Sequence, residues 1–468
     1  SAAYQAAIIL RQLGRDTVLA SADCQIPVAG DGLYRLTLQV RGSDAWGSCN
    51  GQTLCYAAGL PSLAAGQAAV RQFTLDGDRL PGWRAISCAL QPPLAPPLER
   101  IAMFTHEESM RLWNDPVLEW ERSGELFWYR GDFWQDVNAS LDLRQVQKFS
   151  TATSWGILFG TQAKDSSANV AIARLNYQPA SKTLQLQIED SIVASLNCPE
   201  SPADLTLQRC GTLLLVKQDG KLLWNHPLPE RLHGLCLVGR IGYGNTPAWA
   251  NALTILANGI TSYSFQEAPA AWTTASGTWE ITNRWQCDPR WSFFSGVNLE
   301  GPACLWNKFQ HGDRVSFDFF VGPKMDSERG KKYEYAGDFS LVLGADGRDI
   351  SSGYSFMFAG WDNRGSQIVR QKKIMVENPA VTIPRSSAIH RQWFHLKIRK
   401  NHDRLTFWAD GKLVGTCQDS EPLPGRRFGL WTWKNGFMIA QFRVSSDDYS
   451  PAPESVTEVP VLPKTPYN

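Results

Sequence analysis

Three tight turns of the form Asx-Gly constrain the fold of this chain more than any other feature. They are Asn50-Gly51, Asp219-Gly220 and Asp410-Gly411, and each lies between two strand-like runs. Such a pair predicts a β-hairpin, because a type I′ turn needs a positive φ at both central residues. A Pro/Leu element follows each turn, at 60–61, 227–229 and 422–424. The recurrence predicts one β-unit used three times.

The third copy is the most complete. It opens with Trp272, Trp279 and Trp285 and continues through short strand-like runs at 314–320, 339–343, 354–358 and 394–399. Turn residues separate the runs at short, regular intervals, and convincing helical periodicity is absent from the sequence. This pattern is typical of an all-β sandwich.

The second copy repeats the same order. Its tryptophans, Trp120, Trp128 and Trp134, are spaced by 8 and 6 residues, against 7 and 6 in the third copy. The first copy has strand-like runs at 6–11 and 34–40 and a closing run at 83–90, but no tryptophan triplet before them. We therefore expect residues 1–95 to be the C-terminal half of a sandwich. The missing strands would come from another polypeptide, such as the N-terminal product of a cleaved precursor; the alternative is a small self-contained β-domain.

These copies predict five segments. They are the incomplete first β-sandwich at 1–95, a Pro-rich connector at 96–108, a second sandwich at 109–260, a third at 261–446 and a Pro-rich tail at 447–468. A polyproline-like connector is stiff. We expect the tail to lie on the protein's own domains or on a partner.

Composition excludes several classes of protein. With 46 basic and 45 acidic side chains the formal net charge is +1, which argues against a nucleic-acid partner. No apolar run approaches the roughly 20 residues that span a bilayer. The ten cysteines form no C-x-x-C motif, and Cys49–Cys55 and Cys287–Cys304 are the favoured pairs if disulfides form. The even number of cysteines, the start at Ser1 and the sequon at Asn138 together favour an extracytoplasmic location (periplasm, cell surface or secreted) and a removed leader or other processing.

Four stretches carry a family resemblance: 353–363, 393–400, 407–414 and 429–433. In them the chain resembles the concanavalin A-like lectin/glucanase superfamily, in particular the laminin G-like sandwiches of bacterial surface proteins. The resemblance implies tandem antiparallel jelly-roll β-sandwiches. It also implies glycan or protein binding, and in some members glycan hydrolysis.

The sequence contains no catalytic motif that supports an enzyme. Retaining glucanases of this superfamily carry Glu-x-Asp-x-Glu on one strand, which places two carboxylates at the distance needed for nucleophile and acid. Here Glu334 and Asp338 are four residues apart, and Glu119 and Glu121 lack a third partner. We expect no catalytic residues, no transition metal and no cofactor. Asp346 and Asp349 could supply oxygen ligands to calcium, with a plain turn as the alternative.

Aromatic residues supply the candidate ligand site. Trp431 and Trp433 alternate along a predicted strand and therefore share one face. Trp361, like these two, occurs only in the third copy. The candidate ligand-binding set, in which the indoles would stack on sugar rings, is Trp361, Asn363, Trp431, Trp433 and Asn435. Core packing or a protein interface is the alternative role of these side chains.

The main functional prediction is a non-catalytic structural or interaction subunit of a larger extracytoplasmic assembly. Its incomplete first domain and its tail would be the docking features. The alternative is a carbohydrate-binding surface protein, and a third, lower hypothesis is a glycoside hydrolase or lyase.

Overall fold

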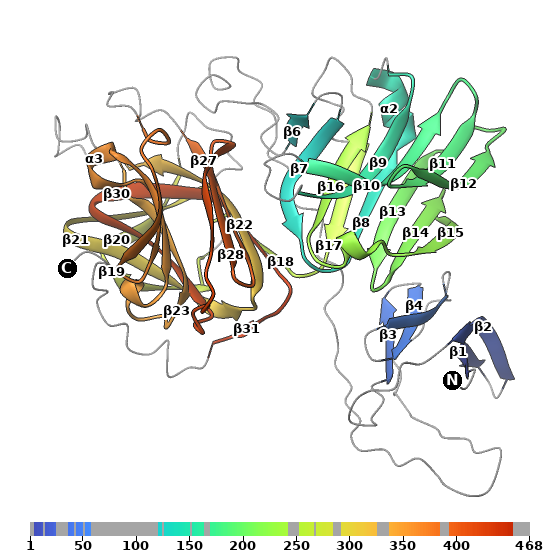
Figure 1. Ribbon diagram of the computed structural model, residues 1–468, viewed down its shortest axis with the longest axis horizontal. Helices are drawn as coiled ribbons and strands as arrows, with labels where there is room; N and C mark the ends of the chain where they lie inside the picture. The colour runs from blue at the N-terminus through green and yellow to red at the C-terminus, as the bar shows by residue number, and fades with distance from the viewer. Residues whose placement is uncertain are drawn as a thin grey trace, which may run out of the picture.

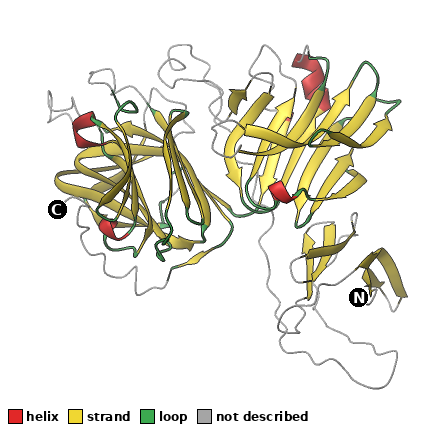
Figure 2. Cartoon of the chain, in the orientation of Figure 1, coloured by secondary structure: helices red, strands yellow, loops and turns green. Residues whose placement is uncertain are grey.

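The computed structural model describes residues 4–12, 15–24, 36–41, 44–49, 52–57, 120–123, 126–149, 152–162, 169–241, 252–265, 268–283, 292–324, 337–383 and 393–452. Most of them lie in antiparallel strands, and the helical segments are short (Figure 2). The predicted all-β class of tandem antiparallel β-sandwiches is confirmed. Two sandwiches stand side by side, with two smaller sheets near the N-terminus (Figure 1).

The second sandwich has sheets of seven and five strands. The larger runs in the order β12 (Ser191–Asn197), β11 (Thr183–Ile188), β10 (Asn169–Gln178), β9 (Trp155–Gln162), β16 (Cys236–Ile241), β7 (Leu126–Phe133) and β6 (Trp120–Ser123). The smaller runs β15 (Lys221–Pro227), β14 (Leu213–Gln218), β13 (Asp204–Cys210), β8 (Val137–Asp142) and β17 (Leu253–Ala257). The helical elements are α2 (Leu143–Phe149) and the 3-10 turn η1 (Glu230–Leu232).

The third sandwich is organised around β30 (Arg427–Ser446), which is 20 residues long and belongs to both layers. Its first part pairs in the order β26 (Lys373–Asn378), β25 (Gly365–Arg370), β24 (Tyr354–Ala359), β23 (Phe339–Ala345), β30. Its last part pairs with β22 (Arg314–Pro323), followed by β27 (Phe394–Asn401), β28 (Arg404–Ala409) and β29 (Lys412–Gln418). The remaining elements are β18 (Ile260–Tyr263), β19 (Trp272–Ser276), β20 (Thr278–Asn283), β21 (Ser292–His311), β31 (Tyr449–Pro451), η4 (Ile350–Ser352) and α3 (Gly360–Asn363).

The strand orders show that the second and third sandwiches repeat one unit. The order β12-β11-β10-β9-β16 matches β26-β25-β24-β23-β30, and β15-β14-β13-β8-β17 matches β29-β28-β27-β22-β30. The two later Asx-Gly turns join equivalent strands, β14 to β15 and β28 to β29. Their φ angles are 50° and 76° at Asp219 and Gly220, and 47° and 71° at Asp410 and Gly411. The predicted two-residue hairpins with positive φ are therefore confirmed at both turns.

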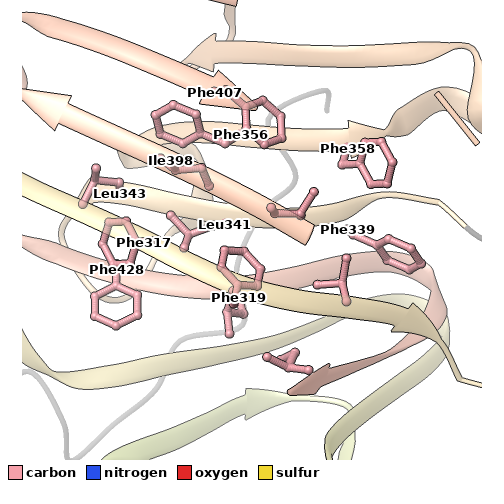
Figure 3. Packing of buried hydrophobic residues seen from close by; sticks show 14 of the residues in the cluster. Phe317, Phe319, Phe339, Leu341, Leu343, Phe356, Phe358, Ile398, Phe407 and Phe428 are labelled. Carbon is pink, nitrogen blue, oxygen red and sulfur yellow. The ribbon is translucent and has the colours of Figure 1, made fainter. Parts of the chain in front are cut away.

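Each sandwich buries its own apolar core between its layers. In the third sandwich, alternate residues of β22, β23, β24, β27, β28 and β30 point inward and meet in a phenylalanine-rich cluster (Figure 3). The second sandwich has an equivalent cluster that includes Trp120. Trp272 lies in the core of the third sandwich, so the leading tryptophan of each triplet is a packing residue.

The N-terminal strands form two small sheets. One pairs β1 (Tyr4–Gln12) with β2 (Arg15–Cys24), and the other has the order β3 (Leu36–Arg41), β4 (Asp44–Cys49), β5 (Gln52–Ala57). Cys49 pairs with Gln52, so the first Asx-Gly pair also joins a hairpin. Tyr56 packs against Cys210 and Leu215 of the second sandwich. The predicted closing strand at 83–90, the connector at 96–108 and residues 453–468 of the tail lie outside the described residues.

A buried charged cluster joins the second and third sandwiches. Asp132, on β7, is 2% exposed. Its carboxylate accepts hydrogen bonds from the Arg399 guanidinium at 2.6 and 2.9 Å and from the Ser316 hydroxyl at 2.7 Å, and it pairs with Lys397 Nζ at 2.7 Å. Burial alone would raise the pKa of Asp132, but the charges of Arg399 and Lys397 hold it well below its usual range. The two sandwiches therefore share an ionic contact.

The two cysteine pairs that the sequence favours in case disulfides form are not bonded in the structure. Cys304 is a buried free thiol and is therefore not joined to Cys287. Cys49 and Cys55 are not disulfide-bonded to each other either. Cys55 lies opposite Gly47 rather than Cys49, and such diagonal cross-strand neighbours stand about 7–8 Å apart, beyond disulfide reach. In the part of the chain that the structure describes, no helix is long and apolar enough to cross a membrane.

Candidate functional site

The candidate site lies at one end of the third sandwich, in the turn between β24 and β25. This turn contains α3 and has left-handed φ angles at Ala359, Trp361, Asp362 and Asn363, between 54° and 61°. Left-handed backbone is costly for residues other than glycine, so the surrounding contacts must hold it in place. Gly337 leads into β23 beside this turn, and a Cβ there would collide with the carbonyl oxygen of Ala359.

Trp361 is the exposed aromatic residue of the turn, with 41% of its surface accessible. Its indole Nε1–H donates to Gln367 Oε1 at 3.0 Å, and Gln367 Nε2 donates to Glu377 Oε1 at 2.9 Å. The backbone N–H of Trp361 donates to Asp338 Oδ1 at 3.2 Å. Hydrogen bonds at both the backbone and the ring therefore fix the position of this partly exposed indole.

Asp338 lies directly beside Trp361. Burial, together with the nearby charge of Asp362, raises the pKa of Asp338 from 3.8 to about 7, against the opposing hydrogen bond from the Trp361 N–H. Near neutral pH this carboxyl group is thus present in both its protonated and its ionised form. It can donate a hydrogen bond in the first form and accept one in either.

Asn363 holds the unsatisfied polar group of the site. The residue is 8% exposed, yet neither its side-chain oxygen nor its side-chain nitrogen has a hydrogen-bond partner among the described residues. Its Oδ1 lies close to Gly337, since a Cβ there would meet this atom. Leaving a buried polar group unpaired costs about 1–3 kcal/mol.

Asn435 supports this arrangement from β30. Its Nδ2 donates to the carbonyl oxygen of Gly337 at 3.1 Å, and its Oδ1 accepts from the Gly436 N–H at 2.8 Å. Thr432 Oγ1 contacts the same Gly337 carbonyl at 3.4 Å. We call Gly337, Asp338, Trp361, Asn363 and Asn435 together the Trp361 site.

The other two predicted ligand residues lie differently. Trp431 is 1% exposed and packs with Trp306 and Met357 in a cluster on the outer face of the sheet. Trp433 is partly buried against the same cluster, with Lys434 Nζ 5.8 Å from its ring centre. The structure thus brings Trp361, Asn363 and Asn435 together around Gly337, and it places Trp431 in a packing role.

Sequence reasoning missed Asp338 and Gln367 as members of this neighbourhood. Asp338 precedes β23 and Gln367 lies on β25. The strands β23 and β25 are the two neighbours of β24 in the sheet. The only signal in the sequence was the run of short strands whose pairing brings them together.

The predicted calcium turn uses its carboxylates internally. Asp346 Oδ1 accepts from the backbone N–H groups of Arg348 and Asp349, at 2.8 and 2.9 Å. Asp349 Oδ1 accepts from the N–H and the hydroxyl of Ser351, both at 2.8 Å. Among the described residues, no group of three or more His, Cys, Asp or Glu side chains could hold a metal ion.

Comparisons with known proteins identify fold likeness only. No protein-family profile and no curated protein matches the chain. Among solved structures, it is similar to the carbohydrate-binding module CBM66 from Bacillus subtilis, with 18% identity, 38% of this chain and 96% of that chain covered, and a TM-score of 0.29. A Bacillus subtilis protein with a galectin-like fold shares 12% identity, with 40% and 94% covered and a TM-score of 0.31.

The exoplasmic/lumenal domain of VIP36 in its Ca²⁺-bound form shares 10% identity, with 42% of this chain and 98% of that chain covered and a TM-score of 0.31. Each likeness spans about two fifths of the chain. At these TM-scores none of them bears on a ligand, so the function is argued from the residues of this chain.

Proposed function

We propose that this protein binds a glycan at the Trp361 site. A pyranose ring has an apolar C–H face that packs on an indole, and hydroxyl groups that both donate and accept hydrogen bonds. The observation that carries the proposal is the fixed, 41% exposed indole of Trp361, in the same turn as the buried and unpartnered carboxamide of Asn363. An aromatic surface with a few well-placed polar groups is the usual composition of a small-molecule site.

In this proposal each residue has a distinct role. Trp361 stacks on the sugar, and the carboxamide of Asn363, which is buried in the free protein, turns outward to donate to one hydroxyl and accept from another. Asp338 accepts from a hydroxyl when ionised. Gln367 and Asn435 position the site through the hydrogen bonds that they make to the Trp361 ring and to Gly337.

A glycan array followed by calorimetry on the best ligand tests the proposal. We expect Trp361→Ala to weaken binding by about tenfold or more, since it removes the stacking surface. The matched control is Tyr449→Ala, because Tyr449 is a similarly exposed aromatic residue of the same sandwich, at 39%. Equal binding by wild type and Trp361→Ala would refute the site, and absence of any array ligand would refute the function.

We further propose that the protein is a non-catalytic, extracytoplasmic protein with laminin G-like domains. The sequence has no Glu-x-Asp-x-Glu run, and Asp338 and Asp362 do not alternate on one strand, because Asp338 precedes β23 and Asp362 lies in the turn between β24 and β25. Recovery of the bound glycan at unchanged mass after long incubation supports this role. A cleaved product would assign the site to a hydrolase or lyase instead.

Membership of a larger assembly is the second candidate function. It is favoured by four exposed apolar side chains on the small N-terminal sheets, Ile9, Val18, Leu36 and Leu38, which are between 54% and 67% exposed. These short sheets bury only a small core of their own, and exposed apolar side chains of this kind often mark a surface that another chain covers. Native mass spectrometry of the protein purified from its source tests this candidate: a particle with the mass of one chain argues against it.

A further inference from the structure

The second sandwich has a pocket that the glycan proposal does not use. It has a volume of about 330 Å³ and is lined by Leu186, Val193, Ala194, Leu222, Leu223, Trp224, Asn225 and His226. These residues come from β11, β12 and β15. β12 is the last strand of the seven-stranded sheet and β15 is the last strand of the five-stranded sheet, at the same end of the sandwich (Figure 1). The pocket is therefore the open mouth between the two layers.

Two β-bulges face each other across this mouth. The register shifts between Leu186 and Gln187, which makes Val193 the extra residue of β12. It also shifts between Val216 and Lys217, which makes Leu223 the extra residue of β15. A bulge breaks the strict alternation of side chains, so consecutive residues can line the same space. Val193 with Ala194, and Leu223 with Trp224, all line the pocket.

The apolar side chains of the walls are incompletely covered. Ala194, Leu223 and Trp224 are partly buried and pack against the core of the sandwich. Val193 is 40% exposed at the mouth. An apolar occupant would remove this surface from water, at about 25 cal/mol per Å².

His226 gives the pocket one defined hydrogen-bonding atom. Its Nδ1 lies 2.7 Å from the carbonyl oxygen of Pro227. A carbonyl oxygen can only accept, so Nδ1 carries the hydrogen in this contact. In the neutral ring, Nε2 is then a hydrogen-bond acceptor. The pocket thus combines hydrocarbon and indole walls with the acceptor of His226, beside the carboxamide of Asn225.

We propose that this pocket binds a small apolar molecule that carries one hydroxyl or N–H donor. Its hydrocarbon or aromatic body lies between Val193 and Trp224, and its donor bonds to Nε2 of His226. The volume falls within the range of roughly 300–1,000 Å³ that is usual for ligand pockets. This site shares no residue with the Trp361 site and lies on a different sandwich.

Two matched probes test the proposal on the full chain. 2-Naphthol has a fused aromatic body and one hydroxyl donor, whereas 2-methoxynaphthalene has the same body without the donor. Saturation-transfer NMR and fluorescence titration measure both. We expect 2-naphthol to bind about tenfold more tightly than its methyl ether, and His226→Ala to remove that difference.

Variants of the walls locate the binding site. Trp224→Ala should weaken both probes by about tenfold. Trp224 also packs on the core, so a second variant, Val193→Arg, is needed. It places a charge at the partly exposed mouth of the pocket. We expect it to weaken the binding of both probes without changing the circular dichroism spectrum of the protein. Trp361→Ala is the control and should leave both titrations unchanged. Failure of 2-naphthol to bind, equal binding of the two probes, or unaltered binding in Val193→Arg would overturn the proposal.

Discussion

At the scale of single residues, His311 is the clearest source of pH dependence. It is 4% exposed and packs between the rings of Phe317, Phe428 and Tyr449. Neither ring nitrogen has a hydrogen-bond partner among the described residues. Burial, with the nearby charges of Arg426 and Arg427, lowers the pKa of His311 from 6.5 to about 3. This imidazole is therefore neutral in the folded protein over most of the acidic range.

This leads to a prediction about acid stability. Between pH of about 6.5 and 3 the unfolded chain binds a proton at His311 that the folded chain does not, so the free energy of unfolding falls as the pH falls. His311→Phe removes that proton and suits the aromatic surroundings. We expect the variant to lose less stability than wild type between pH 6.5 and 4, as measured by urea denaturation at several pH values. Parallel curves would contradict the pKa shift of His311.

At the scale of elements, the Asx-Gly hairpin offers a clean test of backbone strain. Gly220 has a φ of 76°, and a Cβ placed on it would meet nothing within 4 Å. Gly220→Ala should therefore cost about 1 kcal/mol from the left-handed conformation alone. Gly234 is the matched control, because its Cβ position is equally open and its φ is not positive. Gly234→Ala should be neutral or slightly stabilising in the same denaturation experiment; equal losses would contradict this explanation.

The same elements show what the sequence could and could not predict. The turn at Asp219-Gly220 was predictable because two adjacent residues determine it. Alternation also placed Trp431 and Trp433 on one face correctly. It could not tell that this face is covered, because burial of Trp431 depends on Trp306 and Met357 from other strands. Asp338 was passed over for a similar reason: its contact with Trp361 arises only when β23 pairs with β24.

At the scale of the whole molecule, the contact between the second and third sandwiches depends on Asp132. Its carboxylate neutralises Arg399 and Lys397, which lie on β27 in the other sandwich. Asp318 reinforces the contact region: its own burial would raise its pKa, but His395 and Arg443 hold it below the usual range. Arg443 in turn stacks 5.1 Å from the ring of Tyr129, across the same interface.

The last prediction concerns this ionic contact. Asp132→Asn leaves two buried cations without a counter-charge, which should cost about 3–5 kcal/mol at neutral pH. Because the folded pKa of Asp132 is depressed, its contribution is fully present above the unfolded pKa of about 4 and is lost as the pH falls below it. The difference between wild type and Asp132→Asn should therefore be constant from pH 7 to 5 and shrink below pH of about 4.

The control for this prediction is Asp313→Asn. Asp313 pairs with Lys400 of β27. The Lys400 side chain is 3% exposed, but the Asp313 side chain is 68% exposed, so solvent screens the pair and the loss of Asp313 should cost less than the loss of the fully buried Asp132. Denaturation monitored by limited proteolysis distinguishes two outcomes: loss of the ionic contact between the sandwiches, and unfolding of the apolar core of either sandwich. If only the contact is lost, Asp132→Asn should resolve into two transitions, one for each sandwich, while Asp313→Asn keeps the profile of wild type. A single unshifted transition in Asp132→Asn would mean that apolar packing, not charge, joins the two sandwiches.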